Sequence, residues 1–205
     1  MQIVSEEFGL QLNNIPTINL RNEFLVNFDL LTRREFRSQF SGPVGPISTP
    51  YLQWRGMPNT FLTLLMQRAI IGIEAYTIAA VYYELGVIGR LKENIEFIRN
   101  PYLLKGRGTA ENLYNRLPAM ASSEYMLRAW NPQLWLTTRT FYSNIRNPLF
   151  HGYEVEASSV NGVLKAYRHI GQLYEWIDAW HNPEKVIPGF GKVVAIQAEI
   201  AKRDL

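Results

Sequence analysis

Apolar side chains recur at every third or fourth position along most of the chain beyond residue 58, a spacing that places them on one face of an α-helix. The alternation of apolar and polar positions that would predict β-strands is not sustained in this part of the sequence. We therefore expect an all-α fold, a helical bundle of about four long helices. The most regular apolar stripe consists of Val160, Val163, Tyr167, Ile170, Tyr174 and Ile177.

Prolines, glycines and asparagines between the stripes indicate where the helices end. Asn59 is expected to cap the first long helix and Gly86 to end it, and the pair Asn100-Pro101 should stop the second. Glycines and prolines break residues 103–132 into short helical pieces, which predicts a poorly ordered connector or a lid. The expected helices span residues 60–85, 88–99, 133–146 and 160–181.

The same punctuation divides the chain into three parts. Residues 1–57 are expected to form an irregular amino-terminal extension, with a linker rich in proline and glycine at residues 41–50. Residues 58–183 form the helical bundle, and residues 184–205 a short tail with one helix. Within the extension, one helical stripe is formed by Leu25, Phe28, Leu31 and Phe36.

One segment, Ala69–Tyr83, is apolar enough to resemble part of a membrane span. It is too short to cross a bilayer and carries Glu74 near its middle, so we expect a buried helix instead. The first residues of the chain carry two glutamates in place of the basic and apolar regions of a secretion signal. The sequence therefore predicts a cytoplasmic protein without a membrane partner.

Composition narrows the chemistry that the protein can perform. The chain has no cysteine, which excludes disulfides, thiolate metal sites, iron–sulfur clusters and thiol nucleophiles. Its three histidines are not paired at the spacing of helical metal ligands, so we expect neither a metal site nor a cofactor.

Positive charge is concentrated in one region. The whole chain has a net charge of +3, whereas residues 101–150 carry six basic and two acidic residues, a difference of +4. This excess favours an anionic partner such as RNA. The residues counted are Lys105, Arg107, Arg116, Arg128, Arg139 and Arg146 against Glu111 and Glu124.

A cation, an amide and an imidazole lie close together as Arg146, Asn147 and His151. Pro148 should move Asn147 out of the helical conformation, and Gly152 should loosen the backbone after His151. A guanidinium can hold phosphate oxygens, and an imidazole can take the proton of a ribose 2′-OH near neutral pH. This combination favours RNA cleavage to a 2′,3′-cyclic phosphate without a metal.

The string Arg146-Asn147-x-x-x-His151, followed by Gly152-Tyr153, resembles the R-x(4–6)-H motif of HEPN domains (higher eukaryotes and prokaryotes nucleotide-binding). The resemblance covers about residues 59–183. It implies a helical bundle that cleaves RNA without metal as a homodimer, with the Arg and His of both subunits facing one cleft. Because such domains are often toxins or phage-defence proteins, it also implies an antitoxin or a regulatory protein as a partner.

The resemblance assigns catalytic roles to individual residues. It implies that Arg146 holds the phosphate, that Asn147 orients Arg146 or the substrate, and that His151 is the general base or acid. Glu74 lies on an apolar face of the first long helix, where a carboxylate is costly without a partner, so we expect it to pair with Arg146.

Three further residues are candidates for substrate binding. Arg139 lies seven residues before Arg146 and so on the same helix face, with Ser143 between them, and Tyr153 follows the motif. His169 and His181 are expected to be structural. Two other interpretations stay open: a catalytically silent module that binds a nucleotide or a protein, and a structural dimerisation bundle built on the stripe Val160–Ile177.

Overall fold

The computed structural model describes residues 23–28, 31, 57–104, 108–152 and 160–181. Of these residues, 89% are helical, and no strand occurs among them. The expected all-α class is therefore confirmed for the described part of the chain.

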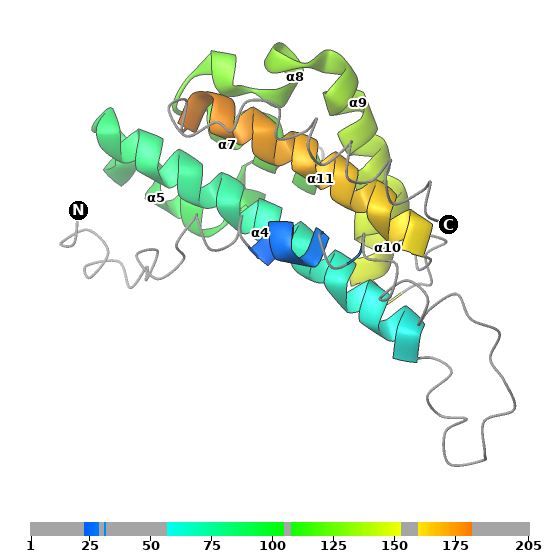
Figure 1. The fold of residues 1–205 in the computed structure, drawn as a ribbon. Helices are drawn as coiled ribbons and strands as arrows, with labels where there is room; N and C mark the ends of the chain where they lie inside the picture. The colour runs from blue at the N-terminus through cyan, green and yellow to red at the C-terminus, as the bar shows by residue number, and fades with distance from the viewer. Residues whose placement is uncertain (1–22, 29–30, 32–56, 105–107, 153–159, 182–205) are drawn as a thin grey trace, which may run out of the picture.

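Two long helices, α4 (Met57–Val87) and α11 (Val160–His181), form the centre of the fold and lie side by side (Figure 1). The Tyr167 hydroxyl donates to the Leu65 carbonyl at 3.1 Å, and the Tyr76 hydroxyl donates to Asp178 Oδ1 at 2.6 Å. In both hydrogen bonds the residue on α11 comes 102 positions after its partner on α4. Because this offset is the same at two points along the helices, α4 and α11 run in the same direction.

The predicted apolar stripe of α11 is buried within the chain's own core. Val163, Tyr167, Ile170, Tyr174 and Ile177 are all completely buried. The interpretation of this stripe as a dimerisation surface is wrong, because its side chains already pack in one core with α4 and with Phe24, Phe28 and Leu31.

Part of the expected extension contributes to that core. Phe24 and Phe28 stack on the ring of Tyr167, with centroids 5.0 and 6.2 Å away. Leu31 is completely buried. Glu23 forms a bidentate ion pair with Arg68 of α4, with Nη2 and Oε2 2.7 Å apart. Leu25 is partly buried against the same core. The stripe predicted here is thus confirmed at Leu25, Phe28 and Leu31, while Phe36 lies outside the described residues.

The second helix begins later than expected. Gly89, in the left-handed region at φ 72°, ends the turn after α4, and α5 spans Leu91–Arg99. It stops before Pro101, as predicted, and a 3₁₀ turn follows as η3 (Pro101–Leu103). Leu91, Ile95 and Ile98, which recur at helical spacing, are buried.

The segment expected to be a poorly ordered connector does consist of short helical pieces, but where it is described it is a packed part of the bundle. It contains α6 (Thr109–Glu111), η4 (Asn112–Arg116), α7 (Leu117–Ala119), η5 (Ser123–Tyr125) and α8 (Leu127–Trp130). The first three form one continuous helix whose middle is a π-helical turn. The expectation failed because the apolar residues carried by these short pieces enter the core. They include Leu113, Tyr114, Leu117 and Leu127.

The continuous helix of α6, η4 and α7 is one of two composite helices, in which a π-turn joins two α-helical pieces. The second composite helix carries the motif and consists of α9 (Pro132–Phe141), η6 (Tyr142–Arg146) and α10 (Asn147–Phe150). The turn predicted at Asn147 is wrong: its φ and ψ are −65° and −50°, and the helix continues to Phe150. Proline lacks an N–H and its ring clashes with the carbonyl four residues earlier in an α-helix. Here a π-turn precedes Pro148, with Asn147 N–H bonded to the Tyr142 carbonyl five residues back, so the wider turn accommodates the ring.

By length and composition α4 is also long and apolar enough to cross a membrane. The segment Leu62–Val87 has a mean hydropathy of 1.4, and 61% of its most apolar window is buried inside the structure. The expectation that the apolar segment is too short is therefore wrong. A mostly buried core helix passes the same test, so the absence of a membrane partner stays a prediction.

Replacing Phe28 tests whether residues 23–28 belong to the core. We expect Phe28→Ala to lower the free energy of unfolding by about 3–5 kcal/mol, because the ring is completely buried. Val26→Ala, at a position that is 67% exposed on the same segment, is the control and should change it by less than about 0.5 kcal/mol. Urea denaturation measures both; equally small effects would show that the segment does not pack on the bundle.

Candidate functional site

A carboxylate on α4 holds the arginine of the motif. Glu74 Oε1 accepts hydrogen bonds from Arg146 Nε at 3.0 Å and from the Tyr142 hydroxyl at 2.8 Å, and Oε2 accepts from Arg146 Nη2 at 3.4 Å. The two charged side chains are only 16% and 12% exposed. The predicted pairing of Glu74 with Arg146 is confirmed, and it is what makes two nearly buried charges tolerable.

Two tyrosines extend this network into the core. The hydroxyls of Tyr114 and Tyr142 are 2.7 Å apart, and the Tyr142 hydroxyl donates in turn to the Glu74 carboxylate. Burial raises the pKa of both tyrosines well above the usual value, and the Glu74 carboxylate adds to the effect. The phenols therefore stay protonated and act as donors, which fixes the orientation of the carboxylate.

The other side of the guanidinium is also occupied. Arg146 Nη1 donates to Asn147 Oδ1 at 3.4 Å, and the Phe150 ring centroid lies 4.6 Å from the guanidinium carbon. A cation over an aromatic face is attracted by the ring quadrupole. Arg146 is thus held in a fixed orientation rather than extended into solvent.

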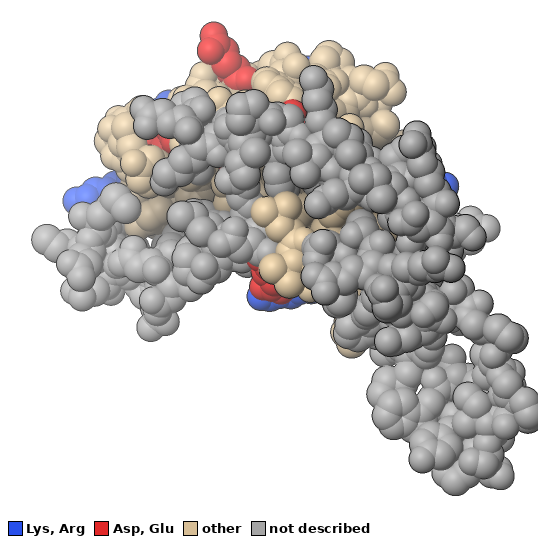
Figure 2. Space-filling view, in the orientation of Figure 1, with Lys and Arg blue, Asp and Glu red and all other residues tan. Residues whose placement is uncertain are grey.

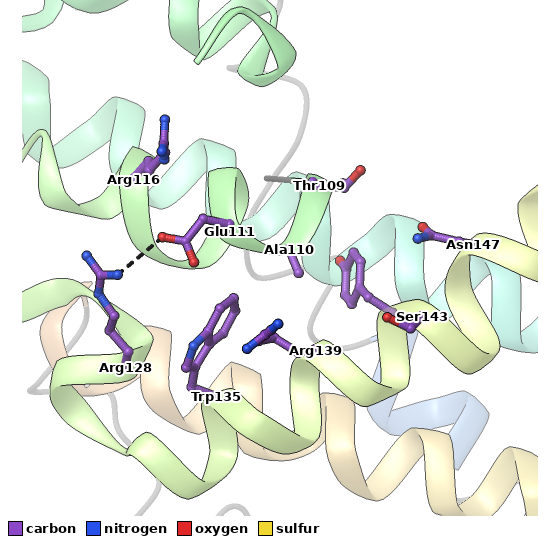
Figure 3. A pocket seen from close by; sticks show the side chains of 11 residues that line it. Thr109, Ala110, Glu111, Arg116, Arg128, Trp135, Arg139, Ser143 and Asn147 are labelled. Atoms are coloured by element: carbon purple, nitrogen blue, oxygen red, sulfur yellow. Dashed lines mark hydrogen bonds and ion pairs between the residues drawn. The ribbon is translucent and has the colours of Figure 1, made fainter. Parts of the chain in front are cut away.

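A pocket of about 470 Å³ lies between the two composite helices (Figure 3). Three arginines from three elements line it: Arg116 of η4, Arg128 of α8 and Arg139 of α9. Glu111 is the one acidic residue among its described lining residues, and it forms an ion pair with Arg128 at 3.4 Å. The pocket wall therefore carries an excess of positive charge.

The predicted substrate-binding residues Arg139 and Ser143 line this pocket together with Asn147. Figure 3 shows Ser143 and Asn147 at one end and Trp135 beside Arg139 toward the other. The Arg139 guanidinium lies 5.9 Å from the indole centroid. Tyr142 lines the pocket as well, so one side chain contacts both the pocket and the Glu74–Arg146 pair.

His151 lies apart from these residues, at the carboxyl end of α10. Its backbone N–H bonds to the Asn147 carbonyl at 3.0 Å, and its side chain is exposed. Gly152 follows with φ 78°, a left-handed conformation that ends the helix. His151 is one turn beyond Asn147 and is not part of the pocket lining. Tyr153 lies outside the described residues.

The pattern of the sequence indicated some of these residues and missed others. Tyr114, Tyr142 and Trp135 are not among the residues that the sequence predicts for the site. A repeated sequence pattern marks both π-turns that line the pocket: Arg116-Leu117-Pro118 and Arg146-Asn147-Pro148 have the same Arg-x-Pro spacing. A π-turn ends at the arginine in each case. Lys105 and Arg107 of the predicted basic region lie outside the described residues.

The other two histidines are structural, as expected. His181 Nδ1 lies 3.0 Å from Glu84 Oε1, near the carboxyl ends of both long helices. His169 packs against the ring of Phe141, and burial lowers its pKa from 6.5 to about 4. It is therefore neutral at physiological pH.

On the face drawn in Figure 2, the described acidic and basic side chains form no continuous patch of one sign. Within the described part of the chain, no group of three or more His, Asp or Glu side chains could hold a metal ion. The chain matches no family model, no curated protein and no solved structure.

A double-mutant cycle measures how strongly Glu74 and Arg146 are coupled. We expect Glu74→Gln and Arg146→Gln each to destabilise the fold and to show a coupling energy of about 1–3 kcal/mol, because both groups are largely buried. The same cycle on the Arg90–Glu93 pair, whose side chains are 52% and 73% exposed, should give less than about 1 kcal/mol. Equal coupling in both pairs would contradict this view of the site.

His169 should make stability depend on pH. Its pKa is lower in the folded state than in the unfolded state, so the unfolded chain binds an extra proton between pH 6.5 and about 4. Across that window, falling pH should reduce the free energy of unfolding by about 3 kcal/mol from this group. Urea denaturation of the wild type and of His169→Asn should differ in slope against pH there, and parallel slopes would refute the assignment.

Proposed function

We propose that this protein is a metal-independent endoribonuclease of the HEPN type that acts as a homodimer. The observation that carries the proposal is the fixed position of Arg146 about one helical turn before His151: Arg146 is held by Glu74, which also accepts a hydrogen bond from Tyr142. A preorganised guanidinium is suited to stabilising the charge that develops on a phosphate during cleavage. The arginine-lined pocket beside Asn147 supports an anionic substrate.

The proposed reaction uses groups on this chain and on a second copy. His151 takes the proton of a ribose 2′-OH, the 2′-oxygen attacks the adjacent phosphorus, and the P–O5′ bond breaks. The 5′-oxygen leaves with a proton from the imidazolium of the second copy, and a 2′,3′-cyclic phosphate remains. Arg146 donates to the phosphate from N–H groups that do not bond to Glu74, and Asn147, hydrogen-bonded to Arg146 Nη1, orients the guanidinium.

A second candidate is a catalytically silent module that binds a nucleotide. The observation that favours it is the position of His151, which lies outside the lining of the pocket that contains the arginines. In that case the pocket would bind the ligand by itself, and an antitoxin or regulatory protein could still be a partner.

Incubation of RNA with the protein in EDTA separates the two candidates. We expect the wild type to leave cyclic-phosphate ends, and His151→Ala to slow cleavage by about 10²–10⁴-fold, as for loss of a general base. Because His151 is exposed, this variant should fold normally. Arg146→Lys keeps the charge but loses the two-point hold of Glu74, so it should also be impaired.

Lys165→Gln, which removes one exposed charge on α11, is the control and should cleave at the wild-type rate. Cleavage that persists in His151→Ala would refute the proposal. A protein that binds RNA in a salt-sensitive manner but never cuts it would establish the second candidate. Light scattering should give the mass of two chains for the active form, and a monomeric active form would exclude the shared site.

A further inference from the structure

The pocket between the composite helices has a positive wall that is not neutralised by its own neighbours. Arg116 and Arg139 are exposed, and neither forms an ion pair with another described residue. Arg128, by contrast, is paired with Glu111 at the rim. Two arginines are therefore available to an anion that enters the pocket.

The same pocket contains a flat aromatic surface. Trp135 is partly exposed and lies beside Arg139, with the guanidinium 5.9 Å from the indole centroid. Positive charge next to an aromatic ring is the combination with which proteins hold single strands, since the backbone meets the cation and a base stacks on the ring. A volume of about 470 Å³ also suits one nucleotide.

We propose that this pocket binds one nucleotide of single-stranded RNA, with Trp135 along its base and Arg139 on its phosphate. Arg116, which Figure 3 shows on the other side of Glu111, would contact a neighbouring phosphate of the strand. The choice of RNA as the source of the nucleotide rests on the proposed function. A single strand is specified because bases inside a duplex have no free face to offer to Trp135.

The position of the pocket relates this nucleotide to the site of cleavage. Ser143 and Asn147 lie at the end of the pocket that leads to the motif, and Asn147 is hydrogen-bonded to Arg146. The bound nucleotide is therefore a neighbour of the nucleotide that is cut. The pocket would position the strand, whereas Arg146 and His151 would act on the scissile phosphate.

Fluorescence anisotropy with a short, labelled single-stranded RNA tests the proposal in the full chain carrying His151→Ala, which keeps the RNA intact. Adding Arg116→Gln should raise the Kd about tenfold and flatten the dependence of log Kd on log salt by about 0.7, the value for one lost phosphate contact. Adding Trp135→Leu should raise the Kd roughly 5- to 100-fold with little change in the salt slope.

One further variant is expected to strengthen RNA binding, and another serves as a control. Glu111→Gln removes the one carboxylate among the described lining residues and frees Arg128, so it should lower the Kd. Lys165→Gln removes an equal amount of positive charge away from the pocket lining and should leave the Kd unchanged. Circular dichroism establishes that each variant is folded.

Competing ligands distinguish the sources of the nucleotide. Unlabelled single-stranded RNA should displace the probe better than a duplex of the same sequence or a mixture of mononucleotides. If Arg116→Gln weakens only mononucleotide binding, or if neither Arg116→Gln nor Trp135→Leu alters the Kd, the proposal is wrong. If the wild type binds RNA without cutting it and these variants lose RNA affinity, the proposed function is wrong but the assignment of this pocket is supported.

Discussion

The ion pair between Glu74 and Arg146 is the interaction on which the arrangement of this molecule depends. A carboxylate placed on a largely buried face of a long apolar helix requires a partner, and the partner must reach it from another element. Arg146 and Tyr142 meet this requirement from one π-turn, which fixes both the depth and the rotation of the composite helix against α4. The positions of Asn147 and His151 follow from that rotation.

The π-turns explain how polar side chains can be presented from helices that also belong to the core. A π-turn adds one residue to a helical turn and so shifts the register of the faces on either side of it. In the composite helix, side chains that enter the core and side chains that line the pocket can therefore lie close together along the chain. Phe141 and Leu149 are buried, while Ser143 and Asn147 between them face the pocket.

The helical class and the apolar faces could be predicted from the sequence because burial imposes a regular spacing. The stripe of α11 and the pairing of Glu74 with Arg146 are confirmed on this basis. The path of the chain around Pro148 could not be predicted, since the local preference of a residue before proline opposes a helix and only the π-turn reconciles them. The packing of residues 109–130 was missed for a related reason: the π-turn within residues 109–119 shifts the spacing of the apolar positions, and the helical pieces that follow are short.

The parallel direction of α4 and α11 has a consequence for the way the site is assembled. Two neighbouring helices that point the same way need a connection that travels back along their length, and here that crossover contains every described residue of the pocket. The composite helix of α9, η6 and α10 runs antiparallel to α4. Glu74 lies opposite Arg146, and Gln67 Nε2 lies 3.5 Å from the Leu149 carbonyl oxygen. The crossover can therefore vary the pocket while α4 and α11 stay constant, provided that the residue opposite Glu74 remains a cation.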